Sequence, residues 1–251
     1  MNERPDMNER PDTALPGWAW LGLPLVIYFS HYLARALLDF AVYDRWVLHE
    51  SGITEKATLV MQALALVGGL LATRWAWRQG DRKLVAFFLV FCLGCVYFGG
   101  EEASWGQHMA GWSAPEEWAE VNDQAETNLH NTSGIAGTLL DQLPRNLLAI
   151  AMLVGGAILP LVRRARGLRH SLHSFRGLIM PGFECVAIGF IAPLASIPEK
   201  ILKAVAGTVP APLEIEAGEV KELMFAVFLA MYIAGVLVRM RRAGAAAPSP
   251  H

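Results

Sequence analysis

The sequence predicts an all-α integral membrane protein of about six transmembrane helices, with a folded helical loop on the outer (periplasmic) side between the third and fourth helices. Hydrophobic residues make up 54% of the 251 positions and charged residues only 18%, which is more apolar than a soluble domain of this length. Six apolar runs approach the roughly 20 residues that cross a bilayer. These runs are Trp18–Leu38, Ala57–Ala76, Leu84–Gly100, Leu147–Val162, Leu178–Ile197 and Leu223–Val238.

The first run has one feature of a secretory signal, because Ala34-Arg35-Ala36 has the form of a cleavage site. The tail before it carries four acidic residues and only two arginines, whereas a signal peptide needs a basic start. We therefore expect a retained helix within a membrane domain that covers residues 17–242. The tail, residues 1–16, opens with MNERPD twice, and we predict that it is disordered, as are residues 243–251.

The distribution of basic residues sets the expected orientation. Fourteen lysines and arginines fall on one side of the predicted spans and six fall in the connections on the other side. Because basic connections stay in the cytoplasm, we expect both termini inside and the connection 100–145 outside. Topology explains the arginines, so no nucleic-acid surface is predicted. The three cysteines lie in apolar runs and offer no extracellular disulfide framework.

The connection 100–145 is the longest in the chain, and it follows the third span within the stretch GGEEASWGQH. Loops of this length in compact proteins are usually folded or functional. Ser113 and Glu116 have the spacing of a capping box, which predicts a helix that starts there. Three tryptophans suit a segment at headgroup depth, namely Trp105, Trp112 and Trp118. We expect an interfacial or re-entrant helical cap over the outer mouth of the bundle.

Glutamate and histidine recur in this connection at a spacing that suits a divalent metal. If the third helix continues past Gly100, Glu101 and His108 share one face, and Glu126 and His130 are one turn apart on any helix there. Carboxylate and imidazole groups bind zinc, which is the favoured metal. The candidate ligands are Glu102, His108, Glu126 and His130, and the candidate catalytic bases are Glu101 and Asp141. The competing interpretation gives these side chains structural hydrogen bonds that hold the loop down.

The first span adds a polar stripe of His31, Arg35 and Asp39, each four residues from the next. Ionisable residues in a span cost roughly 2.5–3.5 kcal/mol each, so they should face the bundle interior and pair. We expect Arg35 to pair with Asp39, and Glu222 to add to the polar lining at the outer end of the last span. The alternative is a purely structural salt bridge near the interface.

Two motifs, Glu101-Glu102-x-Ser104-Trp105-Gly106-Gln107 and Glu126-x-Asn128-Leu129-His130-Asn131, together resemble a pattern in uncharacterised bacterial multi-pass membrane proteins. The resemblance covers about 30 residues of the chain. It implies a protein of the bacterial inner (plasma) membrane, and it brings no established activity.

A narrower likeness joins His130 to Asp141 in the segment LLDQLP, with ten residues between them. This segment is similar to the His…Leu-Leu-Asp-Glu-Leu-Pro segment of the alkaline ceramidases, multi-pass zinc amidohydrolases of lipid substrates. The likeness implies that His130 binds zinc, with Asp141 as second-sphere partner or base. That family also has seven spans, a His-x-x-x-His pair in its last span and a serine one turn before the histidine. Near the position of the His-x-x-x-His pair, this chain has only Glu219 and Glu222. At the position of the serine, it has Glu126.

Three functions follow from these features. The first is a metal-dependent hydrolase that acts on a lipid or lipid-linked substrate at the outer leaflet. The second is a proton- or cation-coupled transporter or channel, with the stripe of the first span along its path. The third is a non-catalytic membrane partner or assembly protein, whose outer tryptophans dock another chain.

Overall fold

The structure is a computed structural model that describes residues 13–49, 52–122, 125–129, 132, 135, 138–168 and 171–245, without the side chains of His108, Ala119 and Asp141. Residues 1–12 and 246–251, which form most of the two predicted tails, lie outside the described residues. The described part is helical, with no β-strand and a single isolated antiparallel bridge between Asn122 and Thr132. The prediction of an all-α fold is therefore confirmed.

Five helical segments of the described chain are long and apolar enough to cross a membrane, and each contains one of the predicted runs. Two of them are single helices, α4 (Arg82–Glu102) and α13 (Ala217–Ala245). The other three segments are Phe40–Arg78, Thr138–Ala165 and Phe175–Ala206. Membrane and multi-pass helical character therefore follow from the length and composition of these segments.

These other three segments are built from several helical pieces. The first contains α2 (Phe40–Tyr43), η2 (Asp44–Leu48) and α3 (Ile53–Arg78). The second contains η4 (Thr138–Gln142), α8 (Leu143–Ala151), η5 (Met152–Ile158) and α9 (Leu159–Ala165). The third contains α10 (Phe175–Ile179), η6 (Phe183–Cys185), α11 (Val186–Leu194) and α12 (Ile197–Ala206).

The remaining predicted run is also helical, but it is not among the five. η1 (Trp18–Gly22) continues directly into α1 (Leu23–Leu37). His31 and Arg35 lie within α1 and lower its mean hydropathy, so this helix is less apolar than the five segments.

The helix formed by η1 and α1 is fixed to the rest of the protein at both ends. Just before it begins, the backbone N–H of Ala14 donates to Oε2 of Glu184 over 3.2 Å. Near its other end, the Arg35 guanidinium lies 3.5 Å from Oε2 of Glu214. The helix therefore runs along the bundle from η6 to the connection between α12 and α13.

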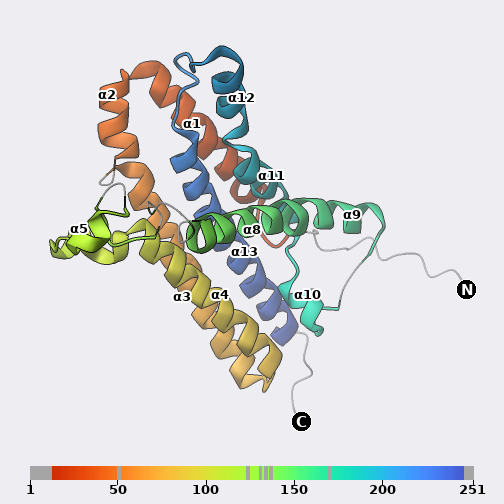
Figure 1. Ribbon diagram of the computed structural model, residues 1–251. Helices are drawn as coiled ribbons and strands as arrows, with labels where there is room; N and C mark the ends of the chain where they lie inside the picture. Colours follow the sequence, from red (N-terminus) through yellow and green to blue (C-terminus); the bar gives the residue numbers. More distant parts are fainter. Residues whose placement is uncertain are drawn as a thin grey trace, which may run out of the picture.

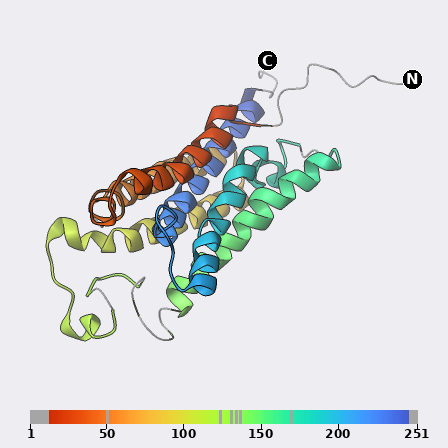
Figure 2. The ribbon, with the colours of Figure 1, turned by 90° about the horizontal axis from the view of Figure 1, so that it is seen from above.

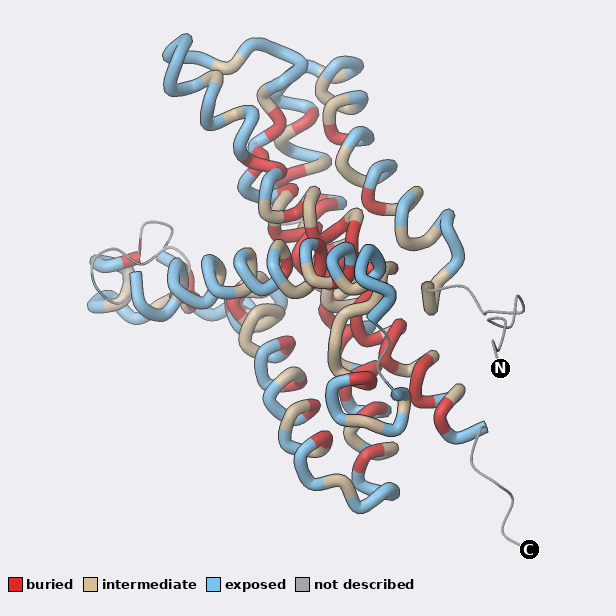
Figure 3. Tube along the Cα trace, turned by 90° about the vertical axis from the view of Figure 1, so that its right-hand side faces the viewer, coloured by how far each residue is buried: buried red, intermediate tan, exposed pale blue. Residues whose placement is uncertain are grey.

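α13 is the central helix of the bundle. It packs along α3, which in turn packs along α4, and α11 packs against both α13 and η5. Figures 1 and 2 show the α3–α4 hairpin on one side of α13, and α11 with the α8–α9 segment on another. Buried residues follow α13 through most of its length, whereas the other spans are buried on one face only (Figure 3). The remaining faces carry exposed apolar side chains, as expected of helices in contact with lipid.

Small residues allow the central helices to approach closely. A Cβ atom added at Gly68 of α3 would lie 2.7 Å from the Ile233 side chain of α13. One added at Gly189 of α11 would lie 2.9 Å from the backbone oxygen of Met152. Close packing of this kind replaces the hydrophobic effect as the source of helix association in a bilayer.

The basic helix ends lie together. The turn between α3 and α4, flanked by Arg78 and Arg82, lies at the same end of the molecule as the C-terminal end of α13, which carries Arg239, Arg241 and Arg242 (Figure 1). The connection that follows α4 lies toward the opposite end. Its described residues include the short helices η3 (Ser104–Gly106), α5 (Gln107–Ala110) and α6 (Glu116–Ala119).

Candidate functional site

The chain reverses direction immediately after α4. Ser104, Trp105 and Gly106 follow one another with φ values of 45°, 54° and 91°. A left-handed conformation costs a non-glycine residue roughly 1–2 kcal/mol, so contacts elsewhere must hold Ser104 and Trp105 in place. The condition for Glu101 and His108 to share one face was a helix continuous through both residues, and it is not met, because α4 ends at Glu102 and His108 belongs to the separate helix α5.

Glu101 ties the end of α4 to the second motif. Its Oε1 accepts a hydrogen bond of 2.7 Å from the indole N–H of Trp105, and its Oε2 accepts one of 2.6 Å from the backbone N–H of Leu129. Glu101 is 5% exposed, so the protein donors replace the water that an exposed carboxylate would bind. The two motifs, which are separated in sequence, are thus in direct contact.

Glu126 makes a second link between the motifs. Its Oε2 accepts from the hydroxyl of Ser104 over 2.7 Å and from the amide of Asn128 over 2.5 Å. The Asn128 amide also donates to the Ser104 oxygen over 2.9 Å. All three side chains are buried, and a buried network of this kind fixes the geometry of its members because an unpaired group would be costly.

The segment that carries Glu126 is irregular. Residues 125–129 form no helix, so the helix that would bring Glu126 and His130 one turn apart is absent from the described part of this segment. Asn122 supplies the reason, because its Oδ1 accepts from the backbone N–H of Glu126 and its Nδ2 donates to the backbone oxygen of Asn128. Asparagine side chains compete with a helix when they bind nearby backbone groups.

Gln107 and Thr127 add further hydrogen bonds between the two motifs. The Gln107 Oε1 accepts from the backbone N–H of Thr127 over 2.6 Å, and the Thr127 hydroxyl donates to the backbone oxygen of Ser104 over 2.9 Å. The expected capping box does not form, since α6 begins at Glu116 with Pro115 before it and no side-chain cap. Side-chain contacts with the turn after α4 hold this loop.

Glu102 points into a different network from Glu126. The Arg145 guanidinium of α8 pairs with Oε1 of Glu222 on α13, and its other terminal nitrogen lies 3.5 Å from Oε1 of Glu102. The side chains of Glu102 and Glu222 are only 7% and 5% exposed. Arg145 therefore joins three spans through two buried carboxylates, Glu102 and Glu222.

The described residues do not by themselves form a metal site. No group of three or more metal-binding side chains occurs among them, and the carboxylates of Glu102 and Glu126 are held by protein donors in separate networks. His130 lies outside the described residues, and the side chains of His108 and Asp141 are not described. The metal hypothesis therefore depends on those three residues.

The polar stripe predicted for the first span (His31, Arg35 and Asp39) does not lie on a single helix. α1 ends at Leu37, and Asp39 caps the next helix by accepting from the backbone N–H of Val42 over 2.9 Å. The expected pair of Arg35 and Asp39 is therefore replaced by the contact of Arg35 with Glu214. His31 is buried, and its Nδ1 lies 3.4 Å from the hydroxyl of Tyr43.

Three carboxylates interact near the connection between α12 and α13, those of Glu199 in α12 and of Glu214 and Glu216 in the connection. Oε2 of Glu199 accepts from the backbone N–H of Ala217 over 2.7 Å at the start of α13. The Glu216 side chain is exposed, but partial desolvation of its carboxyl, reinforced by the carboxylates of Glu199 and Glu214, raises its pKa above the ordinary value. This region is separate from the Glu101 and Glu126 network.

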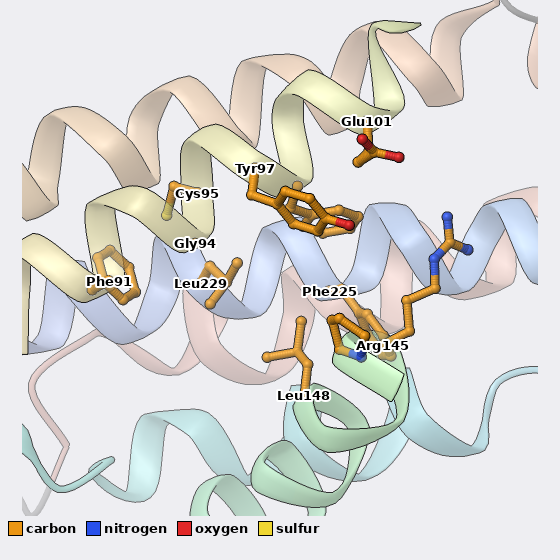
Figure 4. Close-up of a pocket in the computed structure, with 11 residues that line it drawn as sticks. Phe91, Gly94, Cys95, Tyr97, Glu101, Arg145, Leu148, Phe225 and Leu229 are labelled. Carbon is orange, nitrogen blue, oxygen red and sulfur yellow. The ribbon is translucent and has the colours of Figure 1, made fainter. Parts of the chain in front are cut away.

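A cavity of about 250 Å³ lies beside the site, between α4, α8 and α13 (Figure 4). Glu101 and Arg145 stand at one end of it, and the rest of its wall is mainly apolar. The lining residues are Phe91, Gly94, Cys95, Tyr97, Phe98, Glu101, Pro144, Arg145, Leu148, Phe225 and Leu229. Glu101 is thus a member of both the hydrogen-bond network and the cavity wall.

Sequence reasoning missed Arg145 and the roles of Asn122, Asn128 and Gln107. Arg145 entered only as one charge in the count that set the topology. A signal was present, because it is the only lysine or arginine in the acidic connection 100–145. A lone cation of this kind is the natural partner of the nearby buried acids.

No family model, curated protein or solved structure matches this chain. Its function has to be argued from its own residues and their geometry.

Proposed function

We propose that this chain is a membrane-embedded hydrolase that acts at the outer end of its helix bundle on a lipid or lipid-linked substrate. Glu101 carries the proposal. Its carboxylate is oriented by the N–H groups of Trp105 and Leu129 and also borders an apolar cavity between three spans. A fixed carboxylate at the polar end of an apolar cavity suits proton transfer on an amphiphilic substrate.

Glu101 is assigned as the general base that accepts a proton from the attacking water. A base needs a fixed position within hydrogen-bonding reach of that water, and Glu101 has two donors that hold its orientation. The Ser104, Glu126 and Asn128 network is assigned a positioning role, since it holds the strained turn that places Trp105 against Glu101.

A divalent metal, with zinc favoured, is the second part of the proposal. Its support comes from His130, which directly follows Leu129 in the sequence, together with His108 and Asp141. The described carboxylates do not assemble such a site, so no step of the reaction is assigned to the metal. Metal analysis of the purified protein and of the His130→Ala variant tests it, and no stoichiometric metal in either protein contradicts it.

Six spans with both termini in the cytoplasm of a bacterial cell are the proposed topology. The contacts of Ala14 with Glu184 and of Arg35 with Glu214 support η1 and α1 as the sixth span, since they place its ends at opposite ends of the bundle. The basic helix ends then face the cytoplasm and the Glu101 region faces outward.

A proton- or cation-coupled transporter is the second candidate, and one observation favours it. Thr54 and Gln62 of α3 are each 3% exposed and have buried polar atoms without a hydrogen-bond partner, a pattern typical of a hydrated path. Below them the buried face of α3 becomes apolar at Ala65, and Gly68 packs on Ile233. Along the described part of α3, polar side chains therefore line only one portion of the buried face. A polar path does not continue along the helix, and this favours the hydrolase.

A docking role for the outer tryptophans has less support. Trp105 and Trp112 are 46% and 44% exposed. Their indole N–H groups nevertheless point to partners within this chain, Glu101 at 2.7 Å and Thr127 at 3.4 Å. This geometry favours a structural role in the loop.

The hydrolase is tested with protein reconstituted into vesicles of a total membrane-lipid extract. Mass spectrometry follows the loss of a parent lipid and the gain of two fragments whose masses sum to the parent plus water. Products formed by the wild-type protein and lost in Glu101→Gln support the proposal. The absence of products with the wild-type protein contradicts it.

A further inference from the structure

The cavity between α4, α8 and α13 is apolar over most of its wall and polar at one end, an arrangement that matches an amphiphile. Aromatic and aliphatic side chains line most of it, including Phe91, Leu148 and Leu229, whereas Glu101 and Arg145 occupy one end (Figure 4). All three helices belong to segments apolar enough to span a membrane. An apolar chain inside the cavity would therefore leave its polar group beside the Glu101 carboxylate.

The cavity reaches the face of the bundle that contacts lipid. Gly94 lines it and is exposed, and its neighbour on α4, Leu93, is 68% exposed. On the opposite wall, Leu148 lines the cavity while Leu147 is 57% exposed. A chain can therefore enter from the bilayer without passing through water.

The charges at the polar end disfavour an anionic head group. Arg145 is the only basic residue among those that line the cavity. It already pairs with Glu222 and lies 3.5 Å from Glu102, both of them buried acids. An anion at this end would compete with those carboxylates for Arg145 and would also meet Glu101, which repels it at short range.

We propose that this cavity binds one apolar chain of a membrane lipid whose adjoining polar group carries no net negative charge. The inference names the substrate class of the proposed hydrolase and rests on that proposal for its functional meaning. Binding itself can be measured without turnover.

Gly94 offers a direct way to close the cavity. Gly94 lines the cavity and a Cβ atom added there meets nothing within 4 Å, so Gly94→Leu adds a large side chain at the cavity wall without displacing a neighbour. Gly155 is the matched control, because it also lies in a membrane-spanning segment, has nothing within 4 Å of an added Cβ atom, and does not line the cavity. Gly155→Leu adds the same side chain to the lipid-facing bundle.

The experiment is photo-crosslinking in phosphatidylcholine nanodiscs with a monoacylglycerol that carries a diazirine on its chain. We expect labelled peptides from α4, α8 and α13, about tenfold weaker labelling in Gly94→Leu, and unchanged labelling in Gly155→Leu. A fatty acid with the same chain and diazirine position should label more weakly than the monoacylglycerol at neutral pH.

Three results overturn the inference. Equal labelling of Gly94→Leu and wild type would show that the cavity is not the binding site, as would labelling confined to other helices. Stronger labelling by the fatty acid would overturn the preference against negative charge. Specific labelling of a protein that forms no hydrolysis product would leave the binding site standing and contradict the hydrolase alone.

Discussion

The Oε2 atom of Glu101 accepts a hydrogen bond of 2.6 Å from the backbone N–H of Leu129, 28 residues further along the chain. Glu101 lies in the last turn of α4, a helix long and apolar enough to span a membrane, and Leu129 immediately precedes His130 in the sequence. This contact joins two motifs that the sequence displays separately. It makes the turn after α4 part of a buried network whose members can be tested one at a time.

The strained turn predicts an order of stabilities at Ser104. Ser104→Ala removes the hydroxyl that donates to Glu126 but keeps a side chain at a φ of 45°. Ser104→Gly loses the same hydrogen bond and relieves the left-handed strain, so it should be more stable than the alanine variant by about 1 kcal/mol. Unfolding of the two reconstituted variants in denaturant measures the difference. An alanine variant at least as stable as the glycine variant would show that the turn is not strained.

Arg145 should be essential for the stability of the end of the bundle that carries Glu102 and Glu222. Arg145→Met leaves the buried carboxylates of Glu102 and Glu222 without their cation, and the loss of one partner of a buried pair costs about 3–5 kcal/mol. The double variant Arg145→Met, Glu222→Gln removes one of those charges and should recover part of the loss. Unfolding free energies of the two variants test this coupling, and equal values would refute it.

The buried ion pair of Glu184 and Arg239 leaves no room for a larger residue at Gly235. The two side chains are 2.8 Å apart, and a Cβ atom added at Gly235 would lie 2.3 Å from Oε1 of Glu184. Gly235→Ala should therefore cost about 1–3 kcal/mol. Gly218→Ala on the same helix meets nothing within 4 Å and serves as its control. Equal stability of the two alanine variants would mean that the pair can shift to make space.

Glu216 predicts a pH dependence of stability. Its folded pKa is raised by partial desolvation and by the neighbouring carboxylates of Glu199 and Glu214, so the folded protein binds this proton more tightly than the unfolded chain does. The contribution is fully present below the unfolded pKa of about 4 and is lost as the pH rises through the raised folded value. Glu216→Gln should remove this part of the pH profile and be more stable than wild type at neutral pH. Thermal unfolding across the acidic range checks it, and parallel profiles would contradict the assignment.

Much of the fold could be predicted from the sequence because bilayer thickness sets the length of each apolar run. Five of the predicted runs lie inside helices apolar enough to span a membrane, and α3 and α4 extend only a few residues beyond them. The first run was harder to judge, because His31 and Arg35 lower its hydropathy even though it forms a helix.

The site could be predicted only in part. Residue types and spacing drew attention to Glu101 and Glu126, but spacing assumes a helix, and both segments depart from one. The left-handed turn at Ser104 and Trp105 has no local signal, since neither residue favours that conformation. Contacts with the second motif impose it. Likewise, Arg35 pairs with Glu214 because Asp39 serves as a helix cap, a competition between partners that a single helix pattern does not reveal.

The most direct test of the proposed chemistry compares two glutamates of the outer end. Glu101 lies in the buried network, and Glu117 is an exposed residue of α6. The rate of lipid hydrolysis is measured in vesicles for wild type, Glu101→Gln and Glu117→Gln. We predict that Glu101→Gln lowers the rate by roughly a hundredfold or more, as expected for the loss of a general base, and that Glu117→Gln leaves it unchanged. A Glu101→Gln variant as active as wild type would contradict the assignment of this site.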